Sequence, residues 1–560
     1  MVKIDRTWLS PNSEFPGWSP ELAEATLREQ HPHPFTRERL LQSLIILQLR
    51  FGCVSTPMQQ WLSHISKVSL ADIRGLMSFY QFLEESSPSP FHLRFANNII
   101  EQHSGLPDLL QTVSQKLSNT NCRIETTSCI GLSDHPVSLL VNGHPVTRLG
   151  KHNVDEFCRL ITENIPLHSW PRSWFTVDNQ IQHPGPLTSY PYQKGNAVKT
   201  ARQMTREQII NLIGDAGLRG LGGAGFPTAF KWHWCEQQSE QEKYITCNAD
   251  EGEPGTFKDR YYLTHQADQM IEGMVIAALA VGATKGFIYL RGEYLYLYAT
   301  LIQALEQWRA SGELGNAFDI ELQLGAGAYV CGEESAMLES LEGKRGIPKT
   351  KPPFPGEKGL FDKPTIVNNV ETFICATFIL QQGSTAFRKQ GNEKSFGSRL
   401  HSVSGDCNQP GLYELAQGVS VRSLLKLSGA RNTQCVQVGG PSGSLFFEDQ
   451  FETPLDFESP GRGGSIMIFN KTRSVLDIVR NFTRFFRHES CGFCTPCRAG
   501  TVALDQLLDQ FQHTPALQQK SRQDMLELAQ LMQHSSHCGL GKTAGLPVVN
   551  LLQREPANER

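Results

Sequence analysis

The sequence predicts a multidomain α/β protein with helical units towards both ends of the chain. A chain of 560 residues is long enough to fold into three or more domains. Its apolar residues recur first at helical spacing, then as alternating strands and helices, then at helical spacing again. Stretches rich in Pro, Gly and Ser separate these parts and mark the expected boundaries.

The N-terminal part predicts an arm, a helical bundle and a compact α/β domain. Residues 1–30 are rich in Pro, Ser and Glu and predict the arm, and residues 31–89 predict the helical bundle. Residues 90–182 predict a domain of the thioredoxin type. Its expected elements, in order, are a strand at 91–96, a helix at 106–117, a strand at 137–141, a hairpin turn at Asn142-Gly143 and a helix at 154–165.

The remainder predicts four segments. In residues 201–395 short apolar strands alternate with helices, which indicates a layered core. In residues 396–471 short strands with Gly turns are typical of a β-grasp insert. The segments are a linker at 183–200, an α/β core at 201–395, a ubiquitin-like insert at 396–471 and a helical domain at 472–560.

Composition excludes several classes of partner. The formal net charge is −4, so no basic surface argues for nucleic acid or anionic lipid. The N-terminus lacks an apolar signal core, and the apolar runs are too short to span a bilayer, so we expect no direct membrane insertion. Fourteen cysteines without an export signal indicate a reducing compartment, and the expected localisation is cytoplasmic.

Four cysteines near the C-terminus have ligand spacing for an inorganic cluster. Cys491, Cys494 and Cys497 lie within seven residues, and Cys538 can supply a fourth thiolate. This spacing favours a [4Fe–4S] cluster, which carries single electrons. A structural zinc site remains an alternative, although zinc usually takes two separated CxxC pairs. A predicted helix at 473–488 would bring positive charge to this loop. Alternatively, its charged residues would simply form a solvated face. The cations are Arg480, Arg484, Arg487 and His488, and Arg498 follows them.

Two glycine-rich loops predict close approach of a ligand to the backbone. Gly220-Leu-Gly-Gly-Ala-Gly225 matches G-x-G-x-x-G, but a helix and not a strand precedes it, so the dinucleotide fingerprint fails. A phosphate or flat ring could still approach there and meet Lys231, or the segment could be a plain turn. The second loop, 325–332, follows a strand and precedes a helix, which is the arrangement of an anion or cofactor site. Glu333 and Glu334 suit ribose hydroxyls or a carboxamide, or they only complement the helix dipole.

A third segment, 247–260, carries three carboxylates, an amide and two glycines within ten residues after a strand, which is typical of a functional loop. A metal site is one interpretation of such a loop.

Together these segments resemble the NADH-binding flavoprotein subunit of respiratory complex I and its relatives in NAD-linked hydrogenases and formate dehydrogenases. The matching stretches occur in the order typical of that family. They are 222–228 with Lys231-Trp232, 248–255, 325–334, 351–355, 368–372 and 489–501. One departure is Leu221, where the family usually has Arg, and this removes a charge expected near the flavin phosphate.

The resemblance implies FMN and NAD(H) as cofactors, together with one [4Fe–4S] cluster on the four cysteines. No catalytic side chain is implied, because the hydride moves from cofactor to cofactor. The implied FMN-binding residues are Gly220, Gly222, Gly223, Lys231, Asn248, Asp250, Glu251, Gly332, Glu333, Asn368 and Asn369. The implied NAD-binding residues are Phe226, Trp234, Glu253, Glu334, Lys351 and Phe354.

The N-terminal part resembles the thioredoxin-like subunit that partners this flavoprotein, fused here into one chain. That subunit normally holds a [2Fe–2S] cluster with four cysteines. The implied ligand positions in this sequence are Ala96, Glu101, Cys129 and Ser133. With one thiol at four positions, we expect no [2Fe–2S] cluster in this domain and a docking role instead.

The fusion and the short stretch after Cys538 look most like the diaphorase subunit of cytoplasmic NAD-reducing [NiFe] hydrogenase. The implied partners are an iron–sulfur electron-transfer subunit and, beyond it, the hydrogenase small and large subunits. A subunit of an NAD-dependent formate dehydrogenase or of a complex I-type NADH dehydrogenase is the alternative. A non-catalytic scaffold with a vestigial flavin site and a zinc-stabilised NAD enzyme without flavin are alternatives of other classes.

Overall fold

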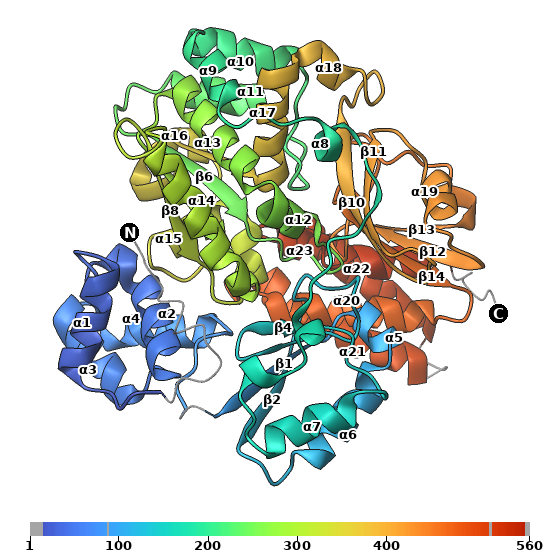
Figure 1. Ribbon diagram of the computed structural model, residues 1–560. Helices are drawn as coiled ribbons and strands as arrows, with labels where there is room; N and C mark the ends of the chain where they lie inside the picture. The colour runs from blue at the N-terminus through green and yellow to red at the C-terminus, as the bar shows by residue number, and fades with distance from the viewer. Residues whose placement is uncertain (1–14, 87–88, 514–517, 555–560) are drawn as a thin grey trace.

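The computed structural model describes residues 15–86, 89–513 and 518–554. Figure 1 shows an N-terminal helical bundle beside a central α/β core, with a thioredoxin-like unit below the core and a β-rich unit on the other side. The C-terminal helices lie between the thioredoxin-like unit and the rest. Residues 1–14 of the expected N-terminal arm lie outside the described residues.

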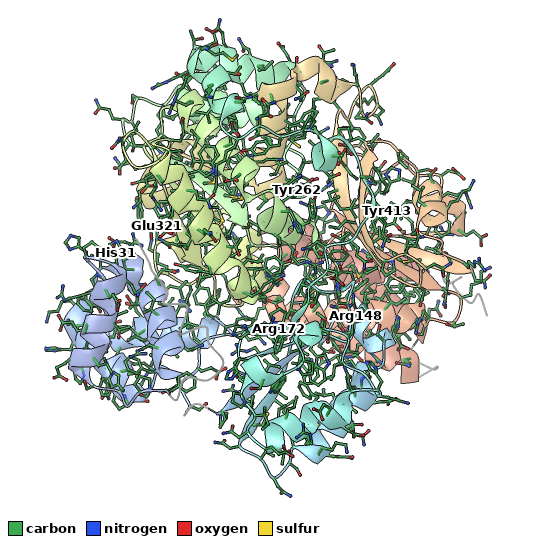
Figure 2. All side chains as sticks on the ribbon, viewed as in Figure 1. His31, Arg148, Arg172, Tyr262, Glu321 and Tyr413 are labelled. Atoms are coloured by element: carbon green, nitrogen blue, oxygen red, sulfur yellow. The ribbon has the colours of Figure 1, made fainter. Side chains whose placement is uncertain are left out.

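The helical bundle packs directly against the core. Arg39 forms a two-pronged ion pair with Glu321, and the Gln42 amide donates to the Leu324 carbonyl. Figure 2 shows Glu321 on the side of the core that faces the bundle. Residues predicted as the end of the arm form a capped helix, because the Ser19 hydroxyl accepts from the Leu22 N–H and Ala23 and Leu27 are buried. The bundle consists of α1 (Pro20–Gln30), η1 (Arg37–Arg39), α2 (Leu40–Phe51), α3 (Thr56–Ser66) and α4 (Leu70–Phe79).

The thioredoxin-like unit has a four-stranded sheet in the order β2-β1-β3-β4. β1 pairs parallel with β2 and antiparallel with β3. The predicted turn is present, with φ of 50° at Asn142 and 82° at Gly143, which is the geometry that a two-residue hairpin needs. Its elements are β1 (Phe91–Ala96), α5 (Ile99–His103), α6 (Leu106–Lys116), β2 (Cys122–Thr127), β3 (Leu139–Val141), β4 (His144–Val146), α7 (Val154–Thr162), η2 (Leu167–Ser169) and η3 (Arg172–Phe175).

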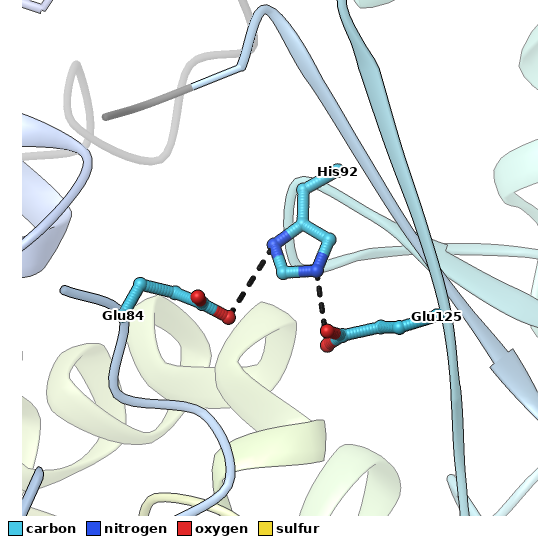
Figure 3. A group of neighbouring side chains, drawn as sticks. All are labelled: Glu84, His92 and Glu125. Carbon is cyan, nitrogen blue, oxygen red and sulfur yellow. Dashed lines mark ion pairs between the residues drawn. The ribbon is translucent and has the colours of Figure 1, made fainter. Parts of the chain in front are cut away.

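A charged cluster joins the bundle to this unit (Figure 3). The His92 ring lies between two carboxylates, with Nε2 2.9 Å from Glu125 and Nδ1 4.0 Å from Glu84. These three side chains have the composition of a metal site, but the Arg94 guanidinium contacts both carboxylates, at 2.8 Å from Glu84 and 2.5 Å from Glu125. Arg123 also pairs with both. The two arginines balance the two carboxylates, so this cluster is a structural junction.

The core contains a four-stranded parallel sheet in the order β8-β7-β6-β9, covered by helices. Helices α13 and α17 are buried along nearly their whole length, as expected for helices that cover a parallel sheet. The elements are α10 (Arg206–Asp215), α11 (Thr228–Glu236), β6 (Tyr244–Ala249), α12 (Lys258–His265), α13 (Ala267–Val281), β7 (Lys285–Leu290), η4 (Gly292–Leu297), α14 (Tyr298–Ala310), β8 (Asp319–Leu324), η5 (Tyr329–Gly332), α15 (Glu334–Leu341), α16 (Pro355–Lys358), η6 (Leu360–Asp362), β9 (Thr365–Asn369), α17 (Val370–Gln382) and α18 (Ser384–Arg388).

The insert is a mixed sheet that takes one strand from outside its own segment. β5, which precedes the predicted linker, pairs parallel with β11 and completes the order β13-β12-β14-β10-β11-β5. The predicted linker at 183–200 is structured and contains α8 and most of α9. The elements are β5 (Ile181–His183), α8 (Pro186–Ser189), α9 (Asn196–Arg202), β10 (Ser398–Gly405), β11 (Gly411–Ala416), α19 (Val421–Leu427), β12 (Thr433–Val438), β13 (Ser444–Phe447), η7 (Glu448–Gln450) and β14 (Ser465–Asn470).

The last unit is helical. Among the described residues it consists of α20 (Val475–Glu489), α21 (Thr495–His513), α22 (Gln518–Ser535), α23 (Gly539–Thr543) and α24 (Leu546–Arg554). No helix in the described part of the chain is both long enough and apolar enough to cross a membrane.

Candidate cofactor and cluster sites

The predicted cofactor residues gather at one edge of the parallel sheet. Strands β6 and β9 are neighbours, and their register places Asn248 opposite Asn369 at the carboxyl ends. The second glycine loop begins where β8 ends, at the same edge. Ligands of open α/β sheets bind beyond the carboxyl ends of the strands, so this edge is the candidate site.

The first glycine loop presents open backbone to this edge. The Gly220 N–H donates to the Phe226 carbonyl at 2.9 Å, which closes the loop. Gly223 has φ of +119°, a conformation that side chains other than glycine rarely adopt, and a Cβ there would meet no atom within 4 Å. Gly222 is exposed, and a Cβ on it would lie 3.2 Å from the Asn369 Cβ. The loop therefore leaves room for a flat ring or phosphate.

A buried carboxyl group faces the site without a partner. Asp250 Oδ2 is buried and has no hydrogen-bond partner among the described residues. Burial raises the pKa of Asp250 well above its usual range, which favours the protonated form that can donate a hydrogen bond. Next to it, the Asn248 amide donates to the Gly332 carbonyl at 2.8 Å, which joins the two loops. An orphaned donor beside uncovered glycines fits a flavin, whose ring carries hydrogen-bond acceptors.

Two other predicted FMN residues, Glu251 and Glu333, accept hydrogen bonds from backbone N–H groups at helix N-termini. Glu251 is buried and accepts from the N–H groups of Asp259 and Arg260, so it caps helix α12 and the sequence did not reveal this role. Glu333 caps α15 in the same way, through the N–H groups of Ser335 and Ala336. The local contacts of Glu333 therefore agree with the alternative interpretation, in which this residue complements the dipole of helix α15.

Asn368 and Asn369 are held by neighbours that the sequence patterns did not indicate. The Trp232 indole donates to Asn368 at 3.0 Å. Asn369 donates to Asp259 at 2.6 Å and accepts from Lys258 at 3.3 Å. The dense charges of residues 256–260 were a signal for this network, but their pairing is visible only in the fold.

A chain of lysines and carboxylates crosses the mouth of the site. Lys351 lies 2.7 Å from both Glu333 and Glu334, and Lys231 lies 3.1 Å from Glu334. Although burial opposes it, the two lysines lower the pKa of Glu334. Lys231, which was expected to meet a phosphate, is therefore already paired with a carboxylate.

Aromatic rings form a row next to this chain. Phe226 follows the first glycine loop, and the Trp234 and Phe354 rings lie 5.6 Å apart, centroid to centroid. Glu253 accepts from the Tyr329 hydroxyl and from the Ser442 N–H of the insert. The predicted NAD-binding aromatics thus lie together, whereas Glu253 points towards the insert.

The four cysteines converge at the end of α20. A Cβ on Gly541 would lie 2.9 Å from the Cys497 Cβ, and the His537 N–H lies 3.5 Å from Cys494 Sγ. Burial raises the pKa of Cys497 to about 11, and the thiols of the other three cysteines add to the rise. These four therefore lie near one another.

The donor set fits a cluster. Three of the four thiols come from the run Cys491, Cys494 and Cys497, and the fourth comes from Cys538. Four cysteine thiolates are the usual ligands of a [4Fe–4S] cluster, so these residues fit such a group.

The expected cations near the cysteines have partners. Arg484 and Arg487 both pair with Asp505, and Arg480 pairs with Asp509. Arg498 instead donates to the carbonyls of Gly492 and Phe493, at 2.6 and 3.2 Å, and so holds the ligand loop. Arg498 is the cation that organises the loop itself.

The cofactor edge and the cysteine loop are in direct contact through Tyr329. The Tyr329 N–H donates to Glu489 at 3.1 Å, and Glu489 lies two residues before Cys491. The Tyr329 ring packs against Phe485 of α20, with centroids 4.9 Å apart. Tyr329 was not among the predicted residues, although it lies inside the second glycine loop.

Three known families match consecutive parts of the chain. The Nuo51 FMN-binding domain matches residues 213–377, and the iron–sulfur binding region of NADH-ubiquinone oxidoreductase-F matches residues 477–557. The NAD-reducing hydrogenase HoxS subunit alpha of Cupriavidus necator is 37% identical over 93% of this chain and 91% of its own length. The chain belongs to the family of this HoxS subunit alpha.

Other relatives agree with the HoxS assignment. A crystal structure of an air-oxidized NAD+-reducing [NiFe]-hydrogenase superposes with a TM-score of 0.86 and 36% identity, over 92% of this chain and 91% of that one. A subunit of the NADH-quinone oxidoreductase of Rhizobium meliloti is 41% identical over 55% of this chain and 79% of its own length. The predicted resemblance and the predicted fold class are confirmed.

One prediction about cofactors is wrong. The third family, described as thioredoxin-like [2Fe-2S] ferredoxin, matches residues 26–162. This match contradicts the expectation that the N-terminal unit lacks a [2Fe–2S] cluster. That expectation counted thiols at four aligned positions of one sequence, whereas the match extends over the whole unit.

Two of the four implied ligand positions, Cys129 and Ser133, are in contact. Cys129 Sγ is 3.7 Å from the Ser133 hydroxyl, and the Asn98 amide donates to that hydroxyl at 3.3 Å. Glu101 is buried and accepts from the N–H and hydroxyl of Ser138.

Proposed function

We infer that this chain is the diaphorase subunit of an NAD-reducing hydrogenase, a flavin iron–sulfur oxidoreductase that uses NAD(H). The observation that carries this inference is the contact of Tyr329 with Glu489, because it joins the cofactor edge to the cysteine loop. FMN, when bound, takes or gives a hydride at one side and single electrons at the other, which suits a site placed between a nucleotide and a cluster.

The chain supplies positioning for this reaction. Gly220, Gly222 and Gly223 leave backbone open on which a flavin would lie, and the unpartnered Asp250 carboxyl would donate a hydrogen bond to it. Lys351 and Lys231 hold Glu333 and Glu334, beside which the dinucleotide would bind. Cys491, Cys494, Cys497 and Cys538 would hold the cluster. Hydride transfer depends on the alignment of two rings, so these binding contacts are the protein's contribution.

We further propose that the chain works in the cytoplasm with an iron–sulfur electron-transfer subunit and the hydrogenase small and large subunits. The support is the extent of the similarity. The HoxS relative aligns with 93% of this chain, including its N-terminal units, whereas the Rhizobium meliloti oxidoreductase subunit aligns with 55%. Nickel in the purified complex would support hydrogenase partners, and its absence with molybdenum or tungsten present would favour the formate dehydrogenase alternative.

The cluster assignment is tested by Cys494→Ala in anaerobically purified complex. We expect loss of iron from this subunit and loss of electron delivery to the partner, because one of four ligands is removed. Bleaching of the flavin absorbance by NADH should persist. Cys407→Ala, at a partly buried thiol in the insert, is the control and should change neither. Undiminished reduction of the partner in Cys494→Ala would refute the electron path.

A further inference from the structure

Glu489, two residues before the first cysteine of the cluster loop, contacts two other parts of the molecule. Its Oε1 atom accepts a hydrogen bond from the Ser128 hydroxyl of the thioredoxin-like unit. Its Oε2 atom accepts from the Tyr329 N–H of the second glycine loop at 3.1 Å. The Glu489 side chain is only 11% exposed. One mostly buried carboxylate therefore joins the thioredoxin-like unit, the cofactor edge and the cysteine loop.

The hydrogen bond from Ser128 lies at the wall of a cavity. This cavity, of about 530 Å³, lies between the thioredoxin-like unit and one face of α20. Asn97 and Thr126 line it from the thioredoxin-like unit, and Arg484 and His488 line it from α20. The two units are therefore not tightly packed against each other there, and the Ser128–Glu489 hydrogen bond connects them across the edge of this space.

Ser128 determines which way the Glu489 carboxylate points. A second group lies next to the same oxygen, because His488 Nδ1 is 3.4 Å from Glu489 Oε1. The His488 side chain is 54% exposed, so a carboxylate that paired only with His488 would be free to turn towards solvent. Such a turn would take Oε2 away from the Tyr329 N–H. Hydrogen bonds to an ionised acceptor are stronger than those between neutral groups, so the Ser128 hydroxyl opposes this turn.

We propose that Ser128 is a positioning residue for electron transfer between the flavin site and the cluster. Its hydroxyl holds Glu489 against the Tyr329 N–H and thereby keeps the cysteine loop in a fixed place beside the cofactor edge. The inference rests on the proposed function. It gives the fused thioredoxin-like unit a direct part in the geometry of electron transfer, because reacting groups must be held in place by contacts from the residues that surround them.

The first test measures amide hydrogen exchange in the purified complex, by mass spectrometry of peptides that contain Tyr329. Ser128→Ala should speed exchange of the Tyr329 N–H by about tenfold, because the carboxylate that protects it is no longer held. Ser128→Thr should restore the wild-type exchange rate, because it keeps the hydroxyl. Ser118→Ala is the matched control and should change nothing. Its exposed hydroxyl belongs to the same unit and donates to the Gln115 carbonyl.

The second test follows the flavin absorbance and the electron paramagnetic resonance signal of the cluster after rapid mixing with NADH. In Ser128→Ala the flavin should bleach at the wild-type rate and the iron content should be unchanged, whereas the cluster signal should appear severalfold more slowly. Glu489→Gln should behave in the same way, because its amide offers one oxygen to two donors. The double variant should be no slower than Glu489→Gln alone, because both changes break one connection.

Several outcomes would overturn the proposal. Unchanged exchange of the Tyr329 N–H in Ser128→Ala would show that Glu489 does not need Ser128, and an unchanged rate of cluster reduction would show that the position of the loop does not matter. Additive slowing in the double variant would mean that the two residues act independently. Equal slowing of flavin and cluster would indicate a general effect on the fold. Wild-type enzyme whose cluster NADH does not reduce would instead refute the proposed function.

Discussion

At the scale of single residues, buried acids dominate the cofactor edge. Asp250, Glu251 and Glu253 lie within four positions, and burial raises the pKa of each. Glu251 is satisfied by helix α12, whereas Asp250 keeps an oxygen free for a ligand. The same loop thus contains one structural acid and one acid available for binding. The difference arises because Glu251 has N–H donors from α12 and the Asp250 Oδ2 atom has no hydrogen-bond partner among the described residues.

Glu253 makes stability depend on pH. Burial raises its pKa from 4.5 to about 7, so the folded protein binds this proton more tightly than the unfolded chain. Its contribution is present at low pH and is lost as the pH rises from about 4.5 to 7. The difference in unfolding free energy between Glu253→Gln and wild type should therefore shift by about 3 kcal/mol in favour of the variant as the pH rises from 4.5 to 8. Denaturant melts at several pH values would measure this difference.

An exposed carboxylate gives the comparison for this experiment. Glu240 pairs with Lys363 and is 53% exposed, so Glu240→Gln should show no such pH-dependent gain. A constant difference between Glu253→Gln and wild type across this range would contradict the raised pKa.

Sequence patterns predicted candidate site residues but not the contacts that hold them in place. The glycines, Asn248, Asn369 and the four cysteines were predicted because the expected chemistry needs those residue types at short spacing. Lys258, Thr372 and Tyr329 were missed, because each acts through contacts with residues distant in the chain, such as the Thr372 hydroxyl that accepts from the Leu221 N–H at 3.0 Å.

At the scale of elements, strong periodicity predicted structure well and short strands were missed. The strand expected before the second glycine loop is β8, and the helix expected at 473–488 is α20, which begins two residues later. β5 has three residues and pairs with β11, far away in the sequence, so no local pattern could reveal it. The segment after it looked like a linker because Pro and Gly break its periodicity.

The segment after β5 is held in place by one buried carboxylate. Glu414 of β11 accepts from the N–H groups of Leu187 and Thr188, both at 2.8 Å, and from the Thr188 hydroxyl. Glu414→Ala leaves these donors without an acceptor, so we expect a loss of about 2–3 kcal/mol in unfolding free energy. We also expect faster proteolytic cleavage within 181–189, which mass spectrometry of limited digests would locate.

Glu452 in the same insert serves as the control for this element. It is 72% exposed and pairs only with Arg422 among the described residues, so Glu452→Ala should leave cleavage of 181–189 unchanged. Equal cleavage rates in Glu414→Ala and wild type would mean that the β5 pairing alone holds the segment.

At the scale of the whole molecule, a buried ion pair joins the thioredoxin-like unit to the core. Arg260 of α12 is fully buried and binds both oxygens of Asp134, at 3.0 and 2.7 Å, and the Gly131 carbonyl. Although burial opposes it, Arg260 and His135 lower the pKa of Asp134 to about 2. The pair is therefore charged at neutral pH and buried at the junction.

Removing one charge of this pair should destabilise the protein strongly. Asp134→Asn leaves Arg260 buried without its counter-charge, and we expect a loss of about 3–5 kcal/mol in unfolding free energy. Calorimetry should show the thioredoxin-like unit melting before the core. Asp178→Asn, which breaks the exposed pair with Arg148 (labelled in Figure 2), should cost no more than about 1 kcal/mol. A single unshifted transition in Asp134→Asn would contradict the proposed coupling of the units.

The segment that leaves the N-terminal bundle also pairs with the second glycine loop. The N–H groups of Gln81 and Phe82 donate to the carbonyls of Gly327 and Ala326, at 3.2 and 3.0 Å. During synthesis the ribosome releases these donors long before the loop that accepts from them. The second glycine loop therefore gains these two hydrogen bonds only when a late stretch of polypeptide returns to an early one. A shortened protein that starts after residue 90 would lack both donors, and its second glycine loop would be less firmly held at the candidate cofactor edge.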